Sequence, residues 1–285
     1  MSFHNLVESS NVPLVTIVIP NYNNGKYLPG CLKELSKQTY NYIEIIVVDD
    51  CSTDDSVYIL EDLKKHYHNL KVYKNEINRG VSYSRNFGVS VSSGEYITTL
   101  DPDDVFYHDK IEKEIATINS LSKKGLQDII AYSGFNSVDD DMNNIPFKSR
   151  LSKNNAVNGW VFKRILYMSS PVPRDMLFTK KQFYTVGGFN ETMSLYEDWE
   201  FKLRLARTYQ FYFSGSPGVK YRRHKKGLSS VDFSIHQKIM GDIFTSYNKT
   251  KGGYLLFKLI NGKGFLSKGI KFLLYFPVFS VFFKD

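Results

Sequence analysis

The chain has 285 residues, 42% of them hydrophobic and 15% aromatic, and it carries a formal net charge of +8. This composition excludes a disordered chain and fits one large α/β domain with a short appendage. The positive charge indicates an acidic partner, for which nucleotide phosphates, anionic lipid and nucleic acid are all candidates. Two cysteines without metal-ligand spacing exclude a disulfide framework and indicate reduced thiols in a cytosolic enzyme. No secretory signal is expected, because the first 13 residues have no charged start followed by an apolar run.

Short apolar or β-branched runs that end in Pro, Asp or Asn predict buried parallel strands over residues 14–20, 43–48, 70–75 and 95–100. Apolar residues at i, i+3, i+4 and i+7 predict helices over 28–35 and 56–63, the second after a Ser-Thr-Asp-Asp segment suited to an N-cap. This alternation predicts right-handed βαβ units and an open, mostly parallel twisted sheet flanked by helices. Ligands of such sheets bind at the carboxyl ends of the strands.

Polar residues follow each of the first three predicted strands. Pro20-Asn21-Tyr22 ends the first, and Asp49-Asp50 ends the second, where the carboxylates either bind a base or ribose or form a turn and a helix cap. Asn78-Arg79-Gly80 and then Arg85 follow the third, and they are either a simple turn or a helix start with a guanidinium suited to phosphate.

The fourth predicted strand runs into Asp101-Pro102-Asp103-Asp104. Carboxylates placed so close together repel one another unless a cation lies nearby. They are suited to a hard divalent cation and, through it, a pyrophosphate, with one of the three as the ligand because Mg²⁺ keeps several waters. The alternative is that Asp103 or Asp104 caps the following helix.

The second half is less regular. A helix with Ile111, Ile115 and Ile118 is expected to lead into a strand over 128–134 that continues the sheet, and 138–159 is expected to be a loop. Glu197 and Asp198 lie at the start of a predicted helix over 195–206. A carboxylate at this position either acts as a base over a substrate or only interacts favourably with the positive end of the helix dipole.

His224 lies among four cations in "YRRHKKGLSS". It is either a metal ligand or phosphate donor, or part of an exposed basic loop. From about residue 232 the pattern is helical, and the apolar run over 264–285 is too short to span a membrane. We expect this basic, aromatic tail to be an in-plane anchor at anionic headgroups, with terminal helix packing as the alternative. The lysines concerned are Lys258, Lys263, Lys268 and Lys271.

Six segments, in this order, resemble the family-2 glycosyltransferases, which have a GT-A type sheet and transfer sugars from nucleotide donors with inversion. They are "VTIVIPNYNN", "IIVVDDCSTDDS", "NRGVSYSRNFG", "GEYITTLDPDD", "GGFNETMSLYEDWEFKLRLA" and "YRRHKKGLSS". The set spans roughly residues 14 to 230. One position departs from the family pattern: Cys51 replaces the usual Gly of Asp-Asp-Gly-Ser, and its side chain is expected to crowd the turn without abolishing nucleotide binding.

The resemblance implies a role for each matching residue. Pro20 and Tyr22 would line the base pocket of a UDP-sugar, Asp50 would contact the polar edge of uracil, and Arg85 would flank the nucleotide. On the diphosphate side, Asp101 would contact the ribose, Asp103 would hold Mn²⁺ or Mg²⁺, and His224 would meet the metal or diphosphate. Asp198 would be the catalytic base and Glu197 its neighbour on the acceptor side.

The resemblance also implies an organisation and a function. A GT-A domain is expected over 1–231, nucleotide-binding over about 14–110 and acceptor-binding over about 111–231, followed by a helical tail over 232–285. The expected activity moves a hexose or N-acetylhexosamine to a glycan, in particular a lipid-linked oligosaccharide of a surface polysaccharide, at the inner face of the cell membrane; nucleic acid is not an expected partner. Alternatives are a polyprenyl-phosphate sugar transferase, a nucleotidyltransferase or a basic polyanion-binding module. The last leaves the acidic clusters unexplained.

Overall fold

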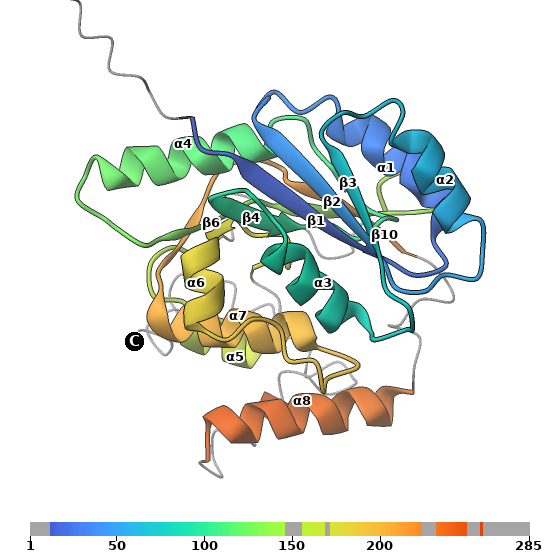
Figure 1. Cartoon of the computed structure of the whole chain (residues 1–285). Coiled ribbons are helices and arrows are strands. Elements are labelled where there is room, and N and C mark those ends of the chain that lie inside the picture. The colour runs from blue at the N-terminus through green and yellow to red at the C-terminus, as the bar shows by residue number, and fades with distance from the viewer. Residues whose placement is uncertain (1–11, 146–155, 169–171, 224–231, 250–256, 259–285) are drawn as a thin grey trace, which may run out of the picture.

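The computed structural model describes residues 12–145, 156–168, 172–223, 232–249 and 257–258 (Figure 1). Its largest sheet has five strands in the order β3-β2-β1-β4-β8, and all neighbours are parallel except β4 and β8. The strands are β1 (Val15–Asn21), β2 (Ile43–Asp49), β3 (Leu70–Lys74), β4 (Tyr96–Thr99) and β8 (Phe178–Thr179). The predicted α/β fold with a mostly parallel sheet is therefore confirmed.

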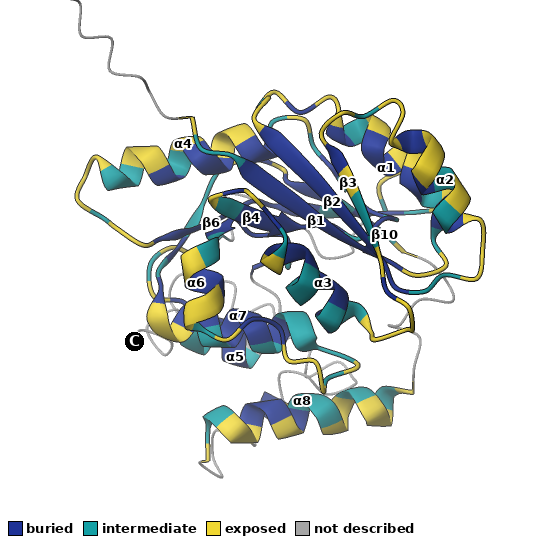
Figure 2. Ribbon diagram, in the orientation of Figure 1, coloured by how far each residue is buried: buried dark blue, intermediate teal, exposed yellow. Residues whose placement is uncertain are grey.

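Strands β1 and β2 form the centre of the core because every one of their residues is buried (Figure 2). Buried strands with such unbroken apolar runs are typical of sheets covered on both faces. The register pairs Val15 with Ile43 and Asn21 with Asp49. Polar residues at the carboxyl ends of the two strands are thus brought side by side, as the sequence predicted.

Helices follow the strands in the first half of the chain: α1 (Leu28–Leu35), α2 (Ser56–Leu63), α3 (Val81–Ser90) and, after the sheet's fourth strand, α4 (Lys110–Ser122). The bounds of α1 and α2 agree with the predicted 28–35 and 56–63. Helix α3 packs very closely on β1, since a Cβ atom added at Gly88 would lie 2.4 Å from Cγ1 of Val18. This close approach holds α3, and the Arg85 side chain on it, against the sheet.

The strand predicted over 128–134 exists as β6 (Ile130–Tyr132), but the prediction that it continues the sheet is wrong. Strand β8 occupies the place beside β4, and β6 instead pairs in parallel with β9 (Phe211–Phe213). The backbones of Ala131 and Leu177 exchange two hydrogen bonds, so β6 is attached to the chain just before β8. Long-range pairing decided this placement, which a local pattern cannot reveal.

A second small sheet consists of β5 (Val105–Phe106), β10 (Val219–Arg222) and β7 (Phe135–Val138), in that order. Strand β5 begins directly after Asp104, and the next helix starts only at Lys110. Asp103 and Asp104 therefore precede a strand, and the alternative that they cap a helix is wrong. The remaining helices are α5 (Phe162–Met168), α6 (Lys180–Thr185), α7 (Glu197–Thr208) and α8 (Phe233–Tyr247).

Helix α8 confirms the helical pattern expected from about residue 232. Its Phe244 packs edge-on against Tyr167 of α5, and it stacks on Phe257, whose ring in turn stacks on Trp199 of α7. No helix in the described ranges is both long enough and apolar enough to cross a membrane. The run over 264–285, with Lys263, Lys268 and Lys271, lies outside the described residues.

Candidate active site

Asp101, Asp103 and Asp104 gather in the turn between β4 and β5. Carboxylate oxygens from the three residues lie within 4.8 Å of one another. The backbone N–H of Asp104 donates to the carbonyl of Asp101 at 3.1 Å, which closes the turn. The structure thus brings together the three carboxylates that the sequence singled out for a cation.

Arg85 joins this cluster to the first turn of α7. Its Nη2 donates to Asp101 Oδ1 at 2.9 Å, and its Nη1 donates to Glu197 Oε1 at 2.7 Å. The side chain is only 2% exposed, and its guanidinium lies over the ring of Phe189. Acidic residues from two segments far apart in the sequence are therefore held beside one another by a buried cation.

Arg174 is a second arginine in the site, and sequence reasoning missed it. Its Nη2 donates to Asp104 Oδ2 and lies 2.9 Å from Asp101 Oδ2, while its guanidinium rests over the ring of Tyr221. Tyr221 itself donates a hydrogen bond to the buried Asp175. Nothing local marks Arg174 in "PVPRDM", so only tertiary structure could have found it.

Asp198 lies at the start of α7 beside Lys202, whose Nζ is 3.3 Å from Asp198 Oδ2. Lys202 is 4% exposed and also donates to the carbonyl of Val172 at 3.0 Å. Trp199 fixes the helix by donating from Nε1 to the carbonyl of Ile165 on α5 at 2.9 Å. The spacing of Asp198 and Lys202, four residues apart on one helix, was a sequence signal for this ion pair.

Burial and neighbouring charges together set the protonation of the site. Burial raises the pKa of Asp198, but Lys202, Arg174 and Arg85 together hold this pKa below its usual value. Burial, opposed only in part by Arg174, raises the pKa of Asp104 well above its usual value. Asp198 is thus held in its ionised form, and the carboxyl groups around Asp104, those of Asp101, Asp103 and Asp175, outnumber the arginines beside them.

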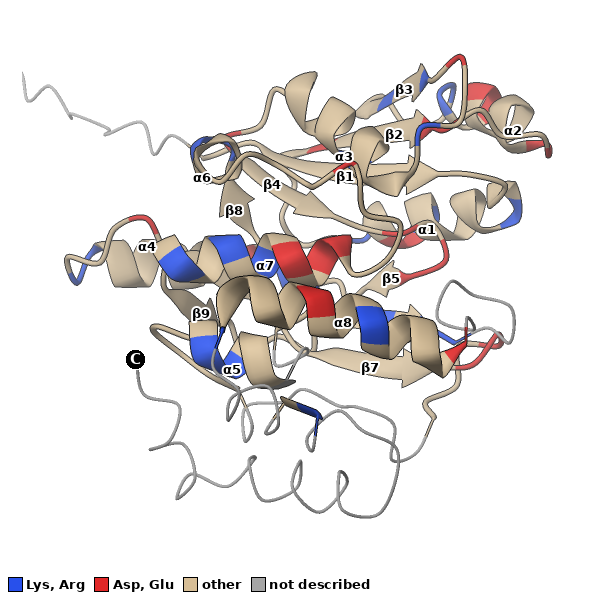
Figure 3. Cartoon of the chain, turned by 90° about the horizontal axis from the view of Figure 1, so that it is seen from below, with Lys and Arg blue, Asp and Glu red and all other residues tan. Residues whose placement is uncertain are grey.

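This excess fits a divalent cation. More carboxyl groups than cations meet here, and Figure 3 shows the acidic residues at the start of α7 and before β5. Carboxylate oxygens are the ligands that Mg²⁺ and Mn²⁺ prefer. Asp101 Oδ1 accepts from Arg85, the two oxygens of Asp104 accept from Arg174 and from the N–H of Arg222, and Asp101 Oδ2 forms an ion pair with Arg174. Asp103 lies in the same turn as these two residues, and its role as the residue that holds the ion stays a prediction from the sequence.

The predicted base pocket lies at the ends of β1 and β2. Tyr22 is 46% exposed at this edge, next to Pro20 and Asn21. Asp50 accepts from the backbone N–H groups of Arg79 and Gly80 at 2.9 and 2.7 Å, and from Asn75 at 2.7 Å. These bonds hold the loop before α3 against the end of β2, and the contact of Asp50 with uracil stays a prediction.

Cys51 has a left-handed backbone with φ of 62°, which explains why the related pattern has Gly there. An L-residue in this conformation costs about 1–2 kcal/mol, whereas Gly adopts it readily. Cys51→Gly is therefore expected to raise the free energy of unfolding by about 1 kcal/mol, after the larger chain entropy of Gly is subtracted, as measured by urea denaturation. Cys51→Ala is the control, because it keeps the backbone strain; equal stabilisation by Ala would show that side-chain crowding matters instead.

Arg85→Gln is expected to destabilise the fold strongly. It leaves Glu197 and Asp101 without their buried partner, and breaking such a pair costs about 3–5 kcal/mol. Urea denaturation measures the loss. Arg79→Gln, at an exposed arginine stacked on Tyr83, serves as the control and should cost no more than about 1 kcal/mol. Similar losses in the two variants would contradict the structural role of Arg85.

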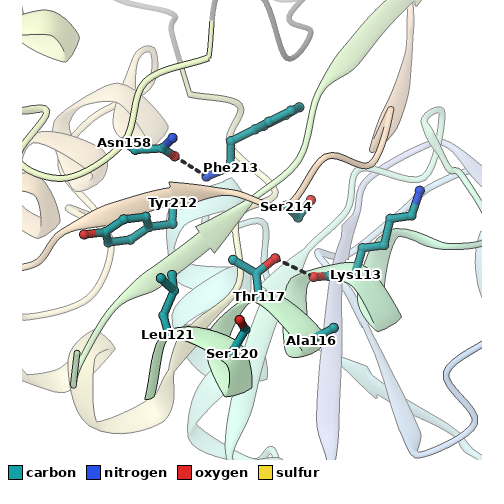
Figure 4. A pocket seen from close by; sticks show the side chains of 9 residues that line it. All are labelled: Lys113, Ala116, Thr117, Ser120, Leu121, Asn158, Tyr212, Phe213 and Ser214. Atoms are coloured by element: carbon teal, nitrogen blue, oxygen red, sulfur yellow. Dashed lines mark hydrogen bonds between the residues drawn. The ribbon is translucent and has the colours of Figure 1, made fainter. Parts of the chain in front are cut away.

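Two further features lie apart from this cluster. A groove of 380 Å³ runs between α4 and β9, and none of the predicted site residues lines it (Figure 4). Its lining includes Lys113, Thr117 and Tyr212.

His224 lies outside the described residues, so its predicted contact with metal or diphosphate stays a prediction.

Comparisons with known proteins identify a matching family and several related sequences. The model of the family described as "Glycosyl transferase family 2" matches residues 16–169. An uncharacterized glycosyltransferase of Rickettsia typhi is 30% identical over 217 residues, covering 74% of this chain and 64% of that protein. Glycosyltransferase GlyG of Streptococcus pneumoniae is 43% identical over 99 residues, 35% of this chain and 33% of that protein.

Longer relatives and a solved structure extend the match. An uncharacterized glycosyltransferase of Rickettsia felis is 28% identical over 82% of this chain, which spans only 38% of that protein's length. The fold resembles S. aureus TarS 1-349 in complex with UDP-GlcNAc, with a TM-score of 0.61 and 19% identity over 85% of this chain and 69% of that one. At this identity the likeness concerns the fold.

Proposed function

This chain belongs to glycosyl transferase family 2, and on that premise we propose that it transfers a hexose or N-acetylhexosamine from a UDP-sugar to a hydroxyl of a glycan acceptor, with inversion. The observation that carries the proposal is the position of Asp198 beside the Asp101–Asp104 cluster. Both arginines that hold the cluster are also near enough to Asp198 to lower its pKa. The proposed base, Asp198, therefore neighbours the proposed diphosphate site at the Asp101–Asp104 cluster.

In the proposed reaction Asp198 takes the proton of the acceptor hydroxyl while that oxygen bonds to the anomeric carbon. The bond between this carbon and the diphosphate oxygen breaks on the opposite face, and UDP leaves with the electron pair. A Mn²⁺ or Mg²⁺ ion held by Asp103 would supply positive charge against the diphosphate. Glu197 is held by Arg85 beside the base, on the side where the acceptor is expected.

The UDP donor is favoured by two observations. Solved structures of TarS, which share the fold, are complexes with UDP-GlcNAc and with UDP. The exposed Tyr22 ring at the carboxyl edge of the sheet also offers a stacking surface for a base.

We place the acceptor at a membrane. The end of the chain, over 258–285, is basic and aromatic in sequence, which suits an in-plane anchor at anionic headgroups on the cytoplasmic face. Such an anchor would bring the site to a lipid-linked oligosaccharide of a surface polysaccharide. This part of the proposal rests on sequence, since 259–285 lie outside the described residues.

The testing experiment measures nucleotide release from UDP-, GDP- and dTDP-sugars, with Mn²⁺ or with EDTA, and with a lipid-linked glycan extract as acceptor. Metal-dependent release from one UDP-sugar, stimulated by the extract, is the expected result. A folded protein that releases nothing from any donor, yet binds polyanions in the presence of a chelator, would overturn the proposal in favour of a binding module.

A further inference from the structure

Arg174 and Arg85 differ in which nitrogen atoms of the guanidinium are paired with carboxylates. Both Nη atoms of Arg85 are paired with carboxylates. In Arg174 the single Nη2 atom meets both Asp101 and Asp104, and Nη1 makes no hydrogen bond with any described residue. The side chain is 28% exposed, against 2% for Arg85, and Nη1 is not among the buried unpaired atoms. Arg174 therefore presents a donor-bearing edge to solvent at the diphosphate site.

The guanidinium of Arg174 lies close to Asp175 without a hydrogen bond to it. Its Nε and the Oδ1 atom of Asp175 are both buried without a hydrogen-bond partner, and they lie 3.8 Å apart. That distance exceeds a hydrogen bond by nearly 1 Å. A small shift of the guanidinium toward Asp175, along the ring of Tyr221, would complete this bond and withdraw Nη2 from Asp101 and Asp104.

We propose that Arg174 is a diphosphate-binding residue that Asp101 and Asp104 hold in the donor-free protein and release to the donor's phosphates when the metal and nucleotide bind. A guanidinium matches phosphate oxygens with two parallel hydrogen bonds, and the exposed Nη1 edge is the part able to make them. The inference rests on the proposed function, because it needs a nucleoside diphosphate at this site.

Loss of the Arg174 guanidinium should affect the binding of metal and the binding of diphosphate in opposite directions. In the donor-free protein, the Arg174 guanidinium lies against Asp101 and Asp104, within the same carboxylate cluster as Asp103, so it repels a divalent cation held there. Removal of the guanidinium should therefore strengthen the binding of metal alone. It should at the same time weaken the binding of a diphosphate, since a cationic donor is lost. A purely structural arginine would not move the two affinities in opposite directions.

The experiment compares wild type and Arg174→Gln by calorimetry, with MnCl₂ alone and with UDP at saturating Mn²⁺. We expect Mn²⁺ alone to bind the variant about 10-fold more tightly, and UDP to bind it about 10-fold or more weakly, which corresponds to one charge-assisted hydrogen bond. UMP should lose less than UDP, because it has a single phosphate. Arg174→Lys keeps the charge without the planar fork and should fall between the two proteins.

Arg204→Gln is the matched control, since Arg204 is a similarly buried arginine paired with Glu200 on α7. It should lower the melting temperature without altering either affinity. Equal UDP affinity in wild type and Arg174→Gln would overturn the role of Arg174 while the proposed function stands. If wild type binds no nucleoside diphosphate with Mn²⁺, the proposed function falls and this role falls with it.

Discussion

Asp198→Asn is expected to lower the turnover of sugar transfer by about 10²- to 10⁴-fold, because an amide cannot accept the proton of the acceptor hydroxyl. The affinity for UDP should be nearly kept, since Asp198 is paired with Lys202 rather than with the Asp101–Asp104 turn. Turnover with a responsive donor and the dissociation constant of UDP measure the two effects separately.

Glu200→Gln provides the control for Asp198→Asn. It makes the same change of charge two positions further along α7, at a carboxylate that pairs with Arg204 and accepts from Tyr247. Its turnover should stay close to that of wild type, and melting temperatures should show that both variants are folded. A collapse of UDP binding in Asp198→Asn, together with turnover, would show that Asp198 belongs to the donor site and is not the base.

Asp103→Ala is expected to act on the donor first. Loss of a metal ligand should weaken UDP binding in Mn²⁺ by about 100-fold or more, since even outer partners of metal ligands cost about 10- to 100-fold in affinity. The UDP affinity of this variant in Mn²⁺ should approach that of wild type in EDTA. Calorimetry of UDP binding under the two conditions measures both values.

Asp62→Ala is a suitable control for Asp103→Ala, because Asp62 is an exposed residue of α2 that pairs only weakly with Lys65. It should bind UDP as wild type does. If Asp103→Ala kept its metal-dependent binding, the ligand would have to be Asp101 or Asp104, and their hydrogen bonds to Arg85, Arg174 and Arg222 would have to break on metal binding.

The first half of the fold was predictable because its signals are local. Apolar residues such as Leu28, Leu32 and Leu35 recur with the helical period, and the unbroken runs of β1 and β2 identify buried strands. Once the strands are known to be parallel, their polar ends must meet at one edge of the sheet. Asp101, Asp103 and the acidic start of α7 were recognised in this way and by their order along the chain.

Other features depended on contacts that no local pattern encodes. Strand β6 was misplaced because its partner β9 lies far along the chain, and β8 takes the sheet edge with only two residues. The N–H groups of Arg79 and Gly80 donate to Asp50 from a distant part of the chain, which no local pattern shows. The left-handed conformation of Cys51 was visible in sequence only as an unusual residue.

The sequence by itself determined which residue types stand at the carboxyl ends of the strands, because periodicity and turn chemistry are properties of neighbouring residues. The tertiary structure alone decided which charges face each other. Arg85 bridges Asp101 and Glu197, and Arg174 meets Asp101 and Asp104, across long stretches of chain. Coulombic attraction depends on distance in space and on burial, not on separation in sequence. The protonation of Asp198 and Asp104, and with it the chemistry of the site, therefore arises only in the folded protein.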